Sequence, residues 1–458
     1  MTEMEIRVRR AVSFIAGDKG ATYAFRIAVG AAVIILYVVG RHQWFTRDDW
    51  ANVISRDALF QSRGWQHWLF EAQDGHWLTI PILIFHFTTQ IFGLGSYWPF
   101  LIPTMVAHVG AVFLVRSICR RVGVSAWTTT LVCSMLLVFG SGWDNIVFAI
   151  QISYNLSLVA FLAQVLLVDH DGPVDRRDYF AAALGVVCLV SSGFGPIFTI
   201  GVLMLLLLRR RGKALAVVVL PQVIVYAWWY LAWETDPAAD KRPGNRAELP
   251  AYLVRGVTAT FESMVTVPAL AGIAIVAALA VALWSGIAWR ARTTLISMWI
   301  TVIVMFLAIG FERIGFGVPT AASSRYLHIS AMLIAPVLAL TVDQLARISR
   351  EVRWAGRLLL AVAVAANAGS LRLFGAQWAL ESRAEKTTFE LIAGSPLAAT
   401  ADPFIIPSRT SPNVALMWLP WMIERDAITP RVTANDAERQ MVLIALGQDP
   451  APTSTSTP

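Results

Sequence analysis

The chain has 458 residues, of which 57% are hydrophobic and only 15% charged. Soluble domains carry roughly 25% charged residues, so this composition excludes a wholly water-facing surface and indicates a protein embedded in a lipid bilayer. The formal net charge of +7 predicts no nucleic-acid partner here, because membrane proteins concentrate Lys and Arg in their cytoplasmic loops. The cysteines, which show neither a disulfide framework nor zinc-ligand spacing, are Cys119, Cys133 and Cys188.

The first apolar run follows a basic N-terminal stretch, as in a signal peptide. No small-residue cleavage site comes after it, so we predict a cytoplasmic N-terminus over 1–21 and an uncleaved first helix over 22–40. Ten further membrane helices are predicted at 97–115, 125–142, 148–168, 179–193, 196–209, 214–233, 265–286, 293–310, 326–345 and 358–373.

Five basic clusters fall at helix ends that share one side of the membrane. If the N-terminus is cytoplasmic, all five lie in the cytoplasm, as the positive-inside rule requires. We therefore predict a multi-pass protein of the cell inner (plasma) membrane whose C-terminus is extracytoplasmic. The clusters are Arg116/Arg120/Arg121, Arg176/Arg177, Arg209/Arg210/Arg211/Lys213, Arg290/Arg292 and Arg347/Arg350/Arg353/Arg357.

Residues 77–94 are apolar enough to suggest another membrane helix. If they crossed the bilayer, every later basic cluster would move outside, and the segment also carries several polar side chains. We interpret it as a juxtamembrane or shallow re-entrant helix on the outer face.

The predicted fold class is an all-α polytopic membrane protein with about eleven transmembrane helices over 22–373. Its long segments lie outside the cell, where function concentrates. They are a first external loop with juxtamembrane helices (41–96), loops at 234–264 and 311–325, an extracytoplasmic C-terminal cap (374–445) and a disordered tail (446–458).

Asp48 and Asp49 lie about eight residues after the first predicted helix, near the outer membrane surface. Adjacent carboxylates can supply a general base and a second acceptor that orients a hydroxyl or binds a divalent metal. An isolated pair more often forms a solvated turn or a helix N-cap. Trp50 and other tryptophans of this loop suit either a sugar site or an interfacial aromatic belt. We take the pair as candidate catalytic residues and Trp50 as a candidate substrate contact.

The end of the first external loop holds two more candidate substrate-binding residues, Asp74 and His76. They precede Pro81, which favours a helix start, so a plain turn into the juxtamembrane helix explains them equally well.

A late external loop carries Glu312, Arg313, Arg325 and Tyr326. An Arg at a helix start opposes the helix dipole, but an anion bound between the helix N-terminus and the guanidinium would remove that mismatch. A snorkelling interfacial Arg is the alternative. We take Arg325 and Arg313 as candidate phosphate-binding residues, and Tyr326 and Glu312 as candidate substrate contacts.

These elements together resemble the GT-C superfamily of membrane glycosyltransferases, which use polyprenyl-phosphate sugars. The resemblance is carried by the Asp48-Asp49 pair after the first helix, by Gly-His-Trp…Pro at 75–81 leading to Phe-Gly-Leu-Gly at 92–95, and by Ser-Arg-Tyr at 324–326. The membrane layout agrees over roughly 20–375.

The resemblance implies a sugar transferred outside the cytoplasm from a polyprenyl-phosphate-linked donor to a glycan, lipid or protein acceptor. By position, Asp48 or Asp49 would be the catalytic base and Arg325 would hold the lipid-linked phosphate. The chain lacks the Trp-Trp-Asp-Tyr-Gly motif of oligosaccharyltransferases and the paired prolines of mannosyltransferase-like branches. No resident metal ligands or cofactor are predicted, although the acidic pair could bind a divalent cation.

Two alternatives remain, a transporter or flippase of lipid-linked saccharides and a non-enzymatic assembly factor that binds polyprenyl lipid. A transporter would place charged groups near the bilayer midplane. The main polar residues within the predicted helices are uncharged: His108, Gln164 and Asn367. An assembly factor would tolerate the loss of both Asp48 and Asp49, whereas an enzyme would not.

Overall fold

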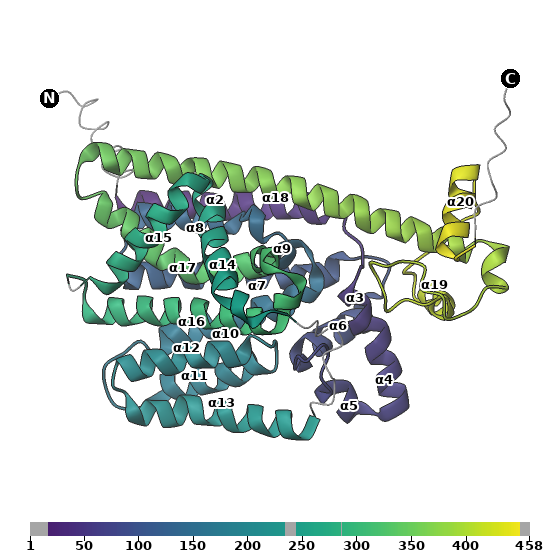
Figure 1. Cartoon of the computed structure of the whole chain (residues 1–458), viewed down its shortest axis with the longest axis horizontal. Helices are drawn as coiled ribbons and strands as arrows, with labels where there is room; N and C mark the ends of the chain where they lie inside the picture. The colour runs from purple at the N-terminus through teal and green to yellow at the C-terminus, as the bar shows by residue number, and fades with distance from the viewer. Residues whose placement is uncertain (1–16, 234–243, 285, 449–458) are drawn as a thin grey trace.

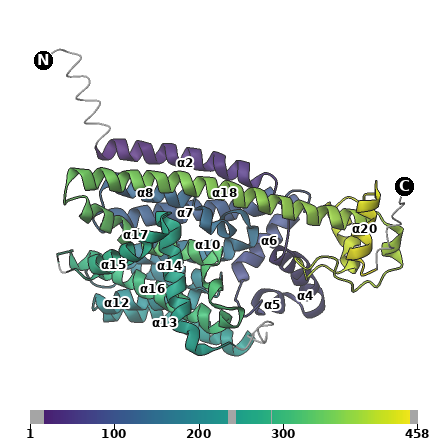
Figure 2. The same ribbon diagram turned by 45° about the horizontal axis from the view of Figure 1, so that its top comes forward.

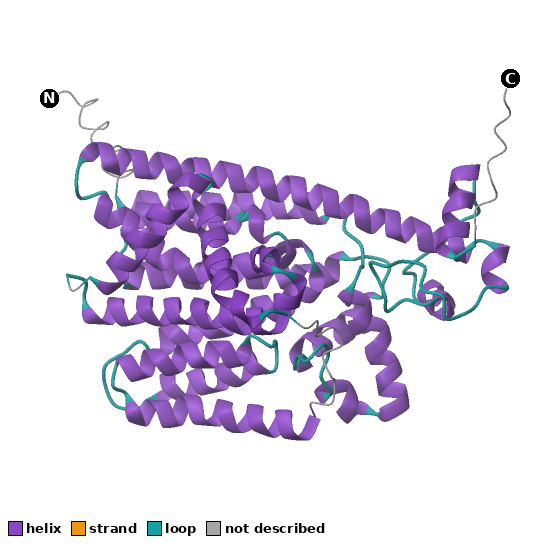
Figure 3. Ribbon diagram, in the orientation of Figure 1, coloured by secondary structure: helices purple, strands orange, loops and turns teal. Residues whose placement is uncertain are grey.

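The computed structural model describes residues 17–233, 244–284 and 286–448, and in this part of the chain every regular element is a helix (Figure 3). The longer helices are α2 (Asp18–Gly40), α7 (Trp98–Arg121), α8 (Ala126–Leu137), α10 (Ile152–Val168), α11 (Arg176–Leu189), α12 (Gly195–Leu208), α13 (Gly212–Trp233), α14 (Leu249–Val265), α15 (Pro268–Leu283), α16 (Trp289–Arg313), α17 (Ser324–Leu345) and α18 (Arg350–Ala393). The shorter helices are α3 (Asp48–Trp50), α4 (Arg56–Arg63), α5 (Trp65–Phe70), α6 (Thr79–Phe92), α9 (Asp144–Val147), α19 (Leu419–Glu424) and α20 (Asp436–Ala445).

The long helices lie side by side and form one bundle (Figure 1). Seven of the described helices are long and apolar enough to cross a membrane, or up to eight if the bent pair α14 and α15 forms one span. The polytopic membrane fold is thus confirmed. The count of eleven stays a prediction, because α8 and α12 are apolar but shorter.

Helix α17 is the centre of the bundle, and every residue from Tyr326 to Thr341 is buried. A helix that is apolar on all sides must be surrounded by others, and α17 packs against α7, α8, α14 and α16. Helices α2 and α18 pack together along one face (Figure 2). The two ends of α17 therefore mark the two ends of the bundle.

The helix predicted over 77–94 forms as α6. It lies at one end of the bundle near α4 and α5 (Figures 1 and 2), where it packs against α5, α7 and α10. This position agrees with the predicted juxtamembrane helix of the first external loop.

The predicted loop at 234–264 is partly wrong. Residues 249–265 form α14, which meets α15 at an angle of 109°. Thr266 breaks the helix with a φ of 56°, and a proline starts α15 two residues later. Sequence hydropathy missed α14 because it carries Arg255 and Glu262, which pair with each other at 2.9 Å. The predicted helix at 265–286 is therefore only the second half of a broken apolar unit, and residues 234–243 lie outside the described part.

Helix α18 has 44 residues, about 66 Å at 1.5 Å per residue, and so exceeds the roughly 30 Å hydrocarbon core. The predicted boundary between membrane domain and cap at 373/374 falls inside it. Apolarity ends there, but the following residues are good helix formers, so the helix continues. Residues 396–448 pack at its far end, where Thr410 Oγ1 donates to Glu385 Oε1 at 2.7 Å (Figure 1). The predicted disordered tail lies mostly outside the described residues.

Candidate active site

The segment before Asp48 is anchored to α18 and to the C-terminal residues. Arg47 has a φ of 50°, which is unusual for a non-glycine residue. Its backbone N–H donates to Ser411 Oγ at 2.9 Å, and its guanidinium lies over the Trp378 ring at 4.4 Å. These contacts fix the direction in which the next two side chains point.

Asp49 points into the protein and is fully buried. Its carboxylate accepts hydrogen bonds from Tyr97 Oη at 2.7 Å, from Ile150 N at 3.1 Å and from Thr46 N at 3.4 Å. Burial raises the pKa of Asp49 to about 8, although these donors oppose the shift. Asp49 therefore joins the first loop to the start of α7 and to the turn before α10, and it has no open face toward a substrate.

Asp48 is only half-buried and points the other way. It lies within electrostatic reach of Asp74 and of three arginines, Arg325, Arg47 and Arg313. Burial raises the pKa of Asp48, Asp74 raises it further, and the arginines partly oppose both effects. The two adjacent carboxylates are thus not equivalent, and only Asp48 faces other charged groups.

The rest of the first loop is folded around the buried side chain of Arg56. Its guanidinium donates to Gln73 Oε1 at 3.1 Å and to the carbonyl oxygens of Trp68 at 3.2 Å and Glu71 at 2.9 Å. One side chain therefore holds α4, α5 and the turn that follows them in a single arrangement.

This turn presents Asp74 and His76 to the same region. Asp74 has a φ of 51°, and the His76 ring packs directly on Gly193, where a Cβ would lie 2.2 Å from Nδ1. Burial, together with the charges of Arg313 and Arg325, lowers the pKa of His76 to about 4. The imidazole is consequently neutral at neutral pH and can donate or accept a hydrogen bond.

Arg325 occupies the first turn of α17, and α9 holds it there. Asp144 N donates to Ser324 Oγ at 3.0 Å, and Asn145 Nδ2 donates to the Arg325 carbonyl at 3.2 Å. The Arg325 guanidinium faces Tyr154, besides Asp144 and Asp48. Its Nε is buried, with no hydrogen-bond partner within the described chain. A buried donor without a partner is costly, and an anionic ligand would satisfy it.

The remaining predicted residues have different surroundings. Arg313 and Glu312, at the end of α16, lie within electrostatic reach of His76. Tyr326 is buried beside Arg325. Trp50 is fully buried, with its ring 5.4 Å from that of Trp44. The prediction that Trp50 contacts substrate is therefore not supported, because packing accounts for its position.

The structure thus brings five predicted residues together at one end of the bundle, which we call the first-loop cluster: Asp48, Asp74, His76, Arg313 and Arg325. Sequence reasoning did not assign site roles to Arg47, Asp144 and Tyr154, which face the same residues. Their positions at the outer ends of predicted helices were the available signal.

Comparison with solved structures finds this fold elsewhere. The chain is similar to ArnT from Cupriavidus metallidurans in the apo state, with a TM-score of 0.55 and 14% identity over 90% of each chain. It is also similar to ArnT from that organism bound to undecaprenyl phosphate, with a TM-score of 0.52 and 14% identity over 91% of this chain and 87% of that one. The chain has the ArnT fold. This confirms, as a likeness of fold, the GT-C-like bundle predicted from sequence. No family model and no curated protein matches the sequence.

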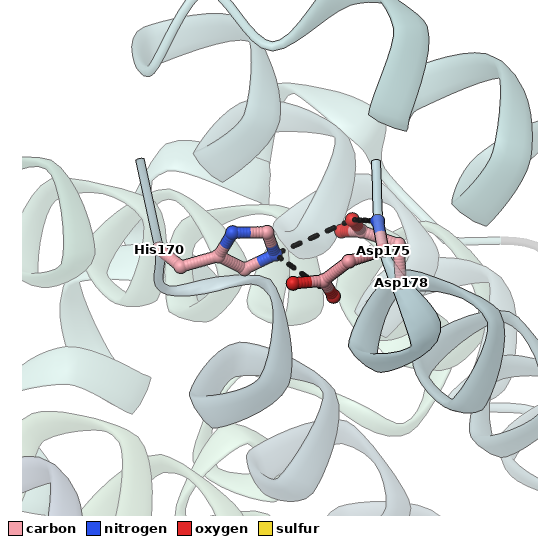
Figure 4. Close-up of side chains that lie close together, drawn as sticks. All are labelled: His170, Asp175 and Asp178. Atoms are coloured by element: carbon pink, nitrogen blue, oxygen red, sulfur yellow. Dashed lines mark hydrogen bonds and ion pairs between the residues drawn. The ribbon is translucent and has the colours of Figure 1, made fainter. Parts of the chain in front are cut away.

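A second charged group lies at the opposite end of the ArnT-like bundle, where His170, Asp175 and Asp178 point toward one another (Figure 4). His170 Nε2 is 3.3 Å from Asp178 and 3.8 Å from Asp175. The Arg211 guanidinium donates to both Asp178 oxygens, at 2.9 and 3.0 Å, and contacts His170 Nε2 at 3.1 Å. An arginine thus occupies the position between the histidine and Asp178 where a cation would bind. We call these four residues the Asp178 network.

Proposed function

We propose that this chain is a GT-C-type glycosyltransferase. It would move a sugar from a polyprenyl-phosphate-linked donor to an extracytoplasmic glycan, lipid or protein acceptor. The observation that carries the proposal is the first-loop cluster, in which a half-buried carboxylate lies within electrostatic reach of Arg325, whose Nε has no hydrogen-bond partner among the described residues. A solved structure of the same fold contains undecaprenyl phosphate, which supports a lipid-linked donor.

Arg325 and Arg313 would bind the donor phosphate. The polyprenyl phosphate leaves as an anion, and guanidinium groups stabilise charge that develops on phosphate oxygens. Arg325 suits this role because α9 fixes its backbone and because Nε has no partner in the described chain. Lys in its place would supply charge without the paired donors.

Asp48 would remove the proton from the acceptor hydroxyl as the new glycosidic bond forms. A carboxylate with an ordinary pKa is a weak base at neutral pH, and burial together with Asp74 raises the pKa of Asp48 toward the working range. The neutral His76 would accept or donate one further hydrogen bond to a sugar hydroxyl.

Asp49 would act as a positioning residue. Its hydrogen bonds to Tyr97 and Ile150 N hold the turn that carries Asp48. Asn has nearly the shape of the protonated Asp49 carboxyl, so this substitution should retain most of the structure.

The matched pair Asp48→Asn and Asp49→Asn tests the proposal. We expect sugar transfer by the purified chain in liposomes, supplied with a lipid extract of its native membranes, to fall by about two to four orders of magnitude for Asp48→Asn. Asp49→Asn should keep transfer within about tenfold of the unmodified chain. Both variants should bind undecaprenyl phosphate as the unmodified chain does. Near-normal transfer by Asp48→Asn would contradict the catalytic role.

A further inference from the structure

A cavity of about 260 Å³ lies at the other end of α17 from Arg325. It is bounded by the start of α8, the end of α17 and the start of α18. The lining residues are Ser125, Thr128, Val342, Asp343, Ala346, Arg347, Arg353 and Arg357. The cavity therefore has three guanidinium groups and one carboxylate.

The carboxylate is already fully engaged by neutral donors. Asp343 Oδ1 accepts from Ser125 Oγ at 2.6 Å and from Thr128 Oγ1 at 2.9 Å, and Oδ2 accepts from Ser125 N at 3.0 Å. These bonds fasten the start of α8 to the end of α17. Asp343 thus lines the cavity, and in the described residues it forms no ion pair with any of the three lining arginines.

The lining arginines differ from the other basic clusters at this end of the bundle. Each of the other four clusters has at least one arginine paired with an aspartate, whereas Arg347, Arg353 and Arg357 have no carboxylate oxygen within 4.0 Å in the described residues. The pairs elsewhere include Arg120–Asp18 at 2.8 Å, Arg121–Asp169 at 3.4 Å, Arg177–Asp175 at 2.7 Å, Arg211–Asp178 at 2.9 Å and Arg290–Asp169 at 3.2 Å.

Two further features favour an anion with an apolar tail. The cavity adjoins the N-terminus of α18, where the helix dipole attracts negative charge, although Ser349 Oγ already accepts from Val352 N and Glu351 lies in the first turn. Beside it lie exposed apolar side chains, with Ile348 70%, Trp354 58% and Leu358 67% exposed. A lipid places its phosphate and its acyl chains side by side in this way.

We propose that this arginine pocket, formed by Arg347, Arg353 and Arg357, binds the phosphate of an anionic phospholipid headgroup. The guanidinium groups donate to the phosphate oxygens, and the acyl chains lie along Ile348 and Leu358. The site is separate from the first-loop cluster and does not depend on the proposed glycosyltransferase activity. Basic pockets between membrane helices are known to bind anionic headgroups.

The test is native mass spectrometry of the full chain in detergent, titrated with dioleoyl phosphatidylglycerol or dioleoyl phosphatidylcholine. The pocket variant is Arg347→Gln/Arg353→Gln/Arg357→Gln. The matched control, Arg176→Gln/Arg210→Gln/Arg292→Gln, removes the same charge from arginines at the same end that form no carboxylate pair. We expect the pocket variant to bind phosphatidylglycerol roughly tenfold to a hundredfold more weakly, and the control to stay within about twofold.

Equal loss in both triple variants, or no preference for phosphatidylglycerol over phosphatidylcholine, would overturn the site. Competition by inorganic phosphate at equal concentration would overturn the lipid assignment. If the pocket variant does not fold, Arg357→Lys replaces it. That variant keeps the charge without the paired donors, so intermediate affinity supports the proposal and unchanged affinity contradicts it.

Discussion

The first-loop cluster and the Asp178 network are both groups of acidic and basic side chains at helix ends, but only in the second do an arginine and an aspartate form a close ion pair. Arg211 donates two hydrogen bonds to Asp178, although its Nε, like that of Arg325, has no hydrogen-bond partner in the described residues. In the first-loop cluster, by contrast, Asp48 and Arg325 lie within electrostatic reach but form no ion pair within 4.0 Å in the described part of the chain. Breaking a buried ion pair destabilises a fold, whereas buried charges without a close ion partner are costly and mark candidate ligand sites. The same contrast separates the arginine pocket from the other basic clusters.

Breaking the ion pair between Arg211 and Asp178 should have the largest effect on the stability of the fold. Arg211→Gln leaves Asp178, which is fully buried, without its charge partner, and we expect a loss of about 3–5 kcal/mol in the free energy of unfolding. Arg177→Gln breaks the exposed pair with Asp175 and should lower the free energy of unfolding far less, because water screens an exposed pair. Thermal unfolding in detergent measures both. Equal, small losses would show that the network contributes no more than a surface pair.

Replacing Arg325 in the first-loop cluster should instead weaken ligand binding. Arg325→Ala should weaken binding of undecaprenyl phosphate by roughly tenfold to a hundredfold, and Arg325→Lys should restore it only partly, because Lys lacks the planar fork. The melting temperature without ligand should change little, since Arg325 forms no ion pair within 4.0 Å in the part of the chain that the structure describes. Unchanged binding in both variants would reduce Arg325 to an interfacial anchor and make Arg313 the next candidate.

Asp49 provides a test through pH. Its pKa is about 8 in the folded chain and near 4 in an unfolded one. The folded state therefore binds more protons between these values, and the stability that Asp49 contributes decreases as pH rises from about 4 to 8. Asp49→Asn should remove this dependence, with a difference of at most about 1.4 kcal/mol per pH unit. A pH-independent difference between the melting curves of the two proteins would show that Asp49 is charged in the folded state.

The substitutions with the smallest expected effect on the protein test its orientation in the membrane. We expect Ala437→Cys, exposed on α20, to react with an impermeant thiol reagent in intact cells, and Glu351→Cys, exposed at the start of α18, to react only after lysis. The three native cysteines are buried and should give little background. The reverse labelling pattern would invert the predicted topology.

The sequence predicted the helical bundle well because apolar length and basic clusters depend only on local composition. It also predicted that Asp48, His76 and Arg325 share one end, because that follows from counting membrane crossings. It could not separate Asp48 from Asp49. Their difference depends on Tyr97 and Ile150 N, which come from elements 48 and 101 residues away.

The errors have a common physical cause. Hydropathy indicates which residues suit a membrane and not where a helix ends, so the predicted helix stopped well before the end of α18. It also missed α14, because that helix carries Arg255 and Glu262, whose charges pair with each other. The burial of Trp50 could not be predicted for a related reason. An aromatic side chain next to a candidate catalytic residue can either line the site or pack beneath it. For Trp50, its contacts with the rings of Trp44 and Phe45 show that it is packed in the interior.

The central claim is that the chain transfers a sugar outside the cytoplasm and that Asp48 carries out the chemistry. Mass analysis of the cell-envelope glycans tests it most directly, in cells without the protein and in the same cells supplied with the unmodified chain, Asp48→Asn or Asp49→Asn. We predict that one glycan, lipid or protein loses the mass of a single sugar type when the protein is absent. The unmodified chain and Asp49→Asn should restore that mass, and Asp48→Asn, present in equal amount, should not. Identical envelope glycans in all four strains, or full restoration by Asp48→Asn, would contradict the account.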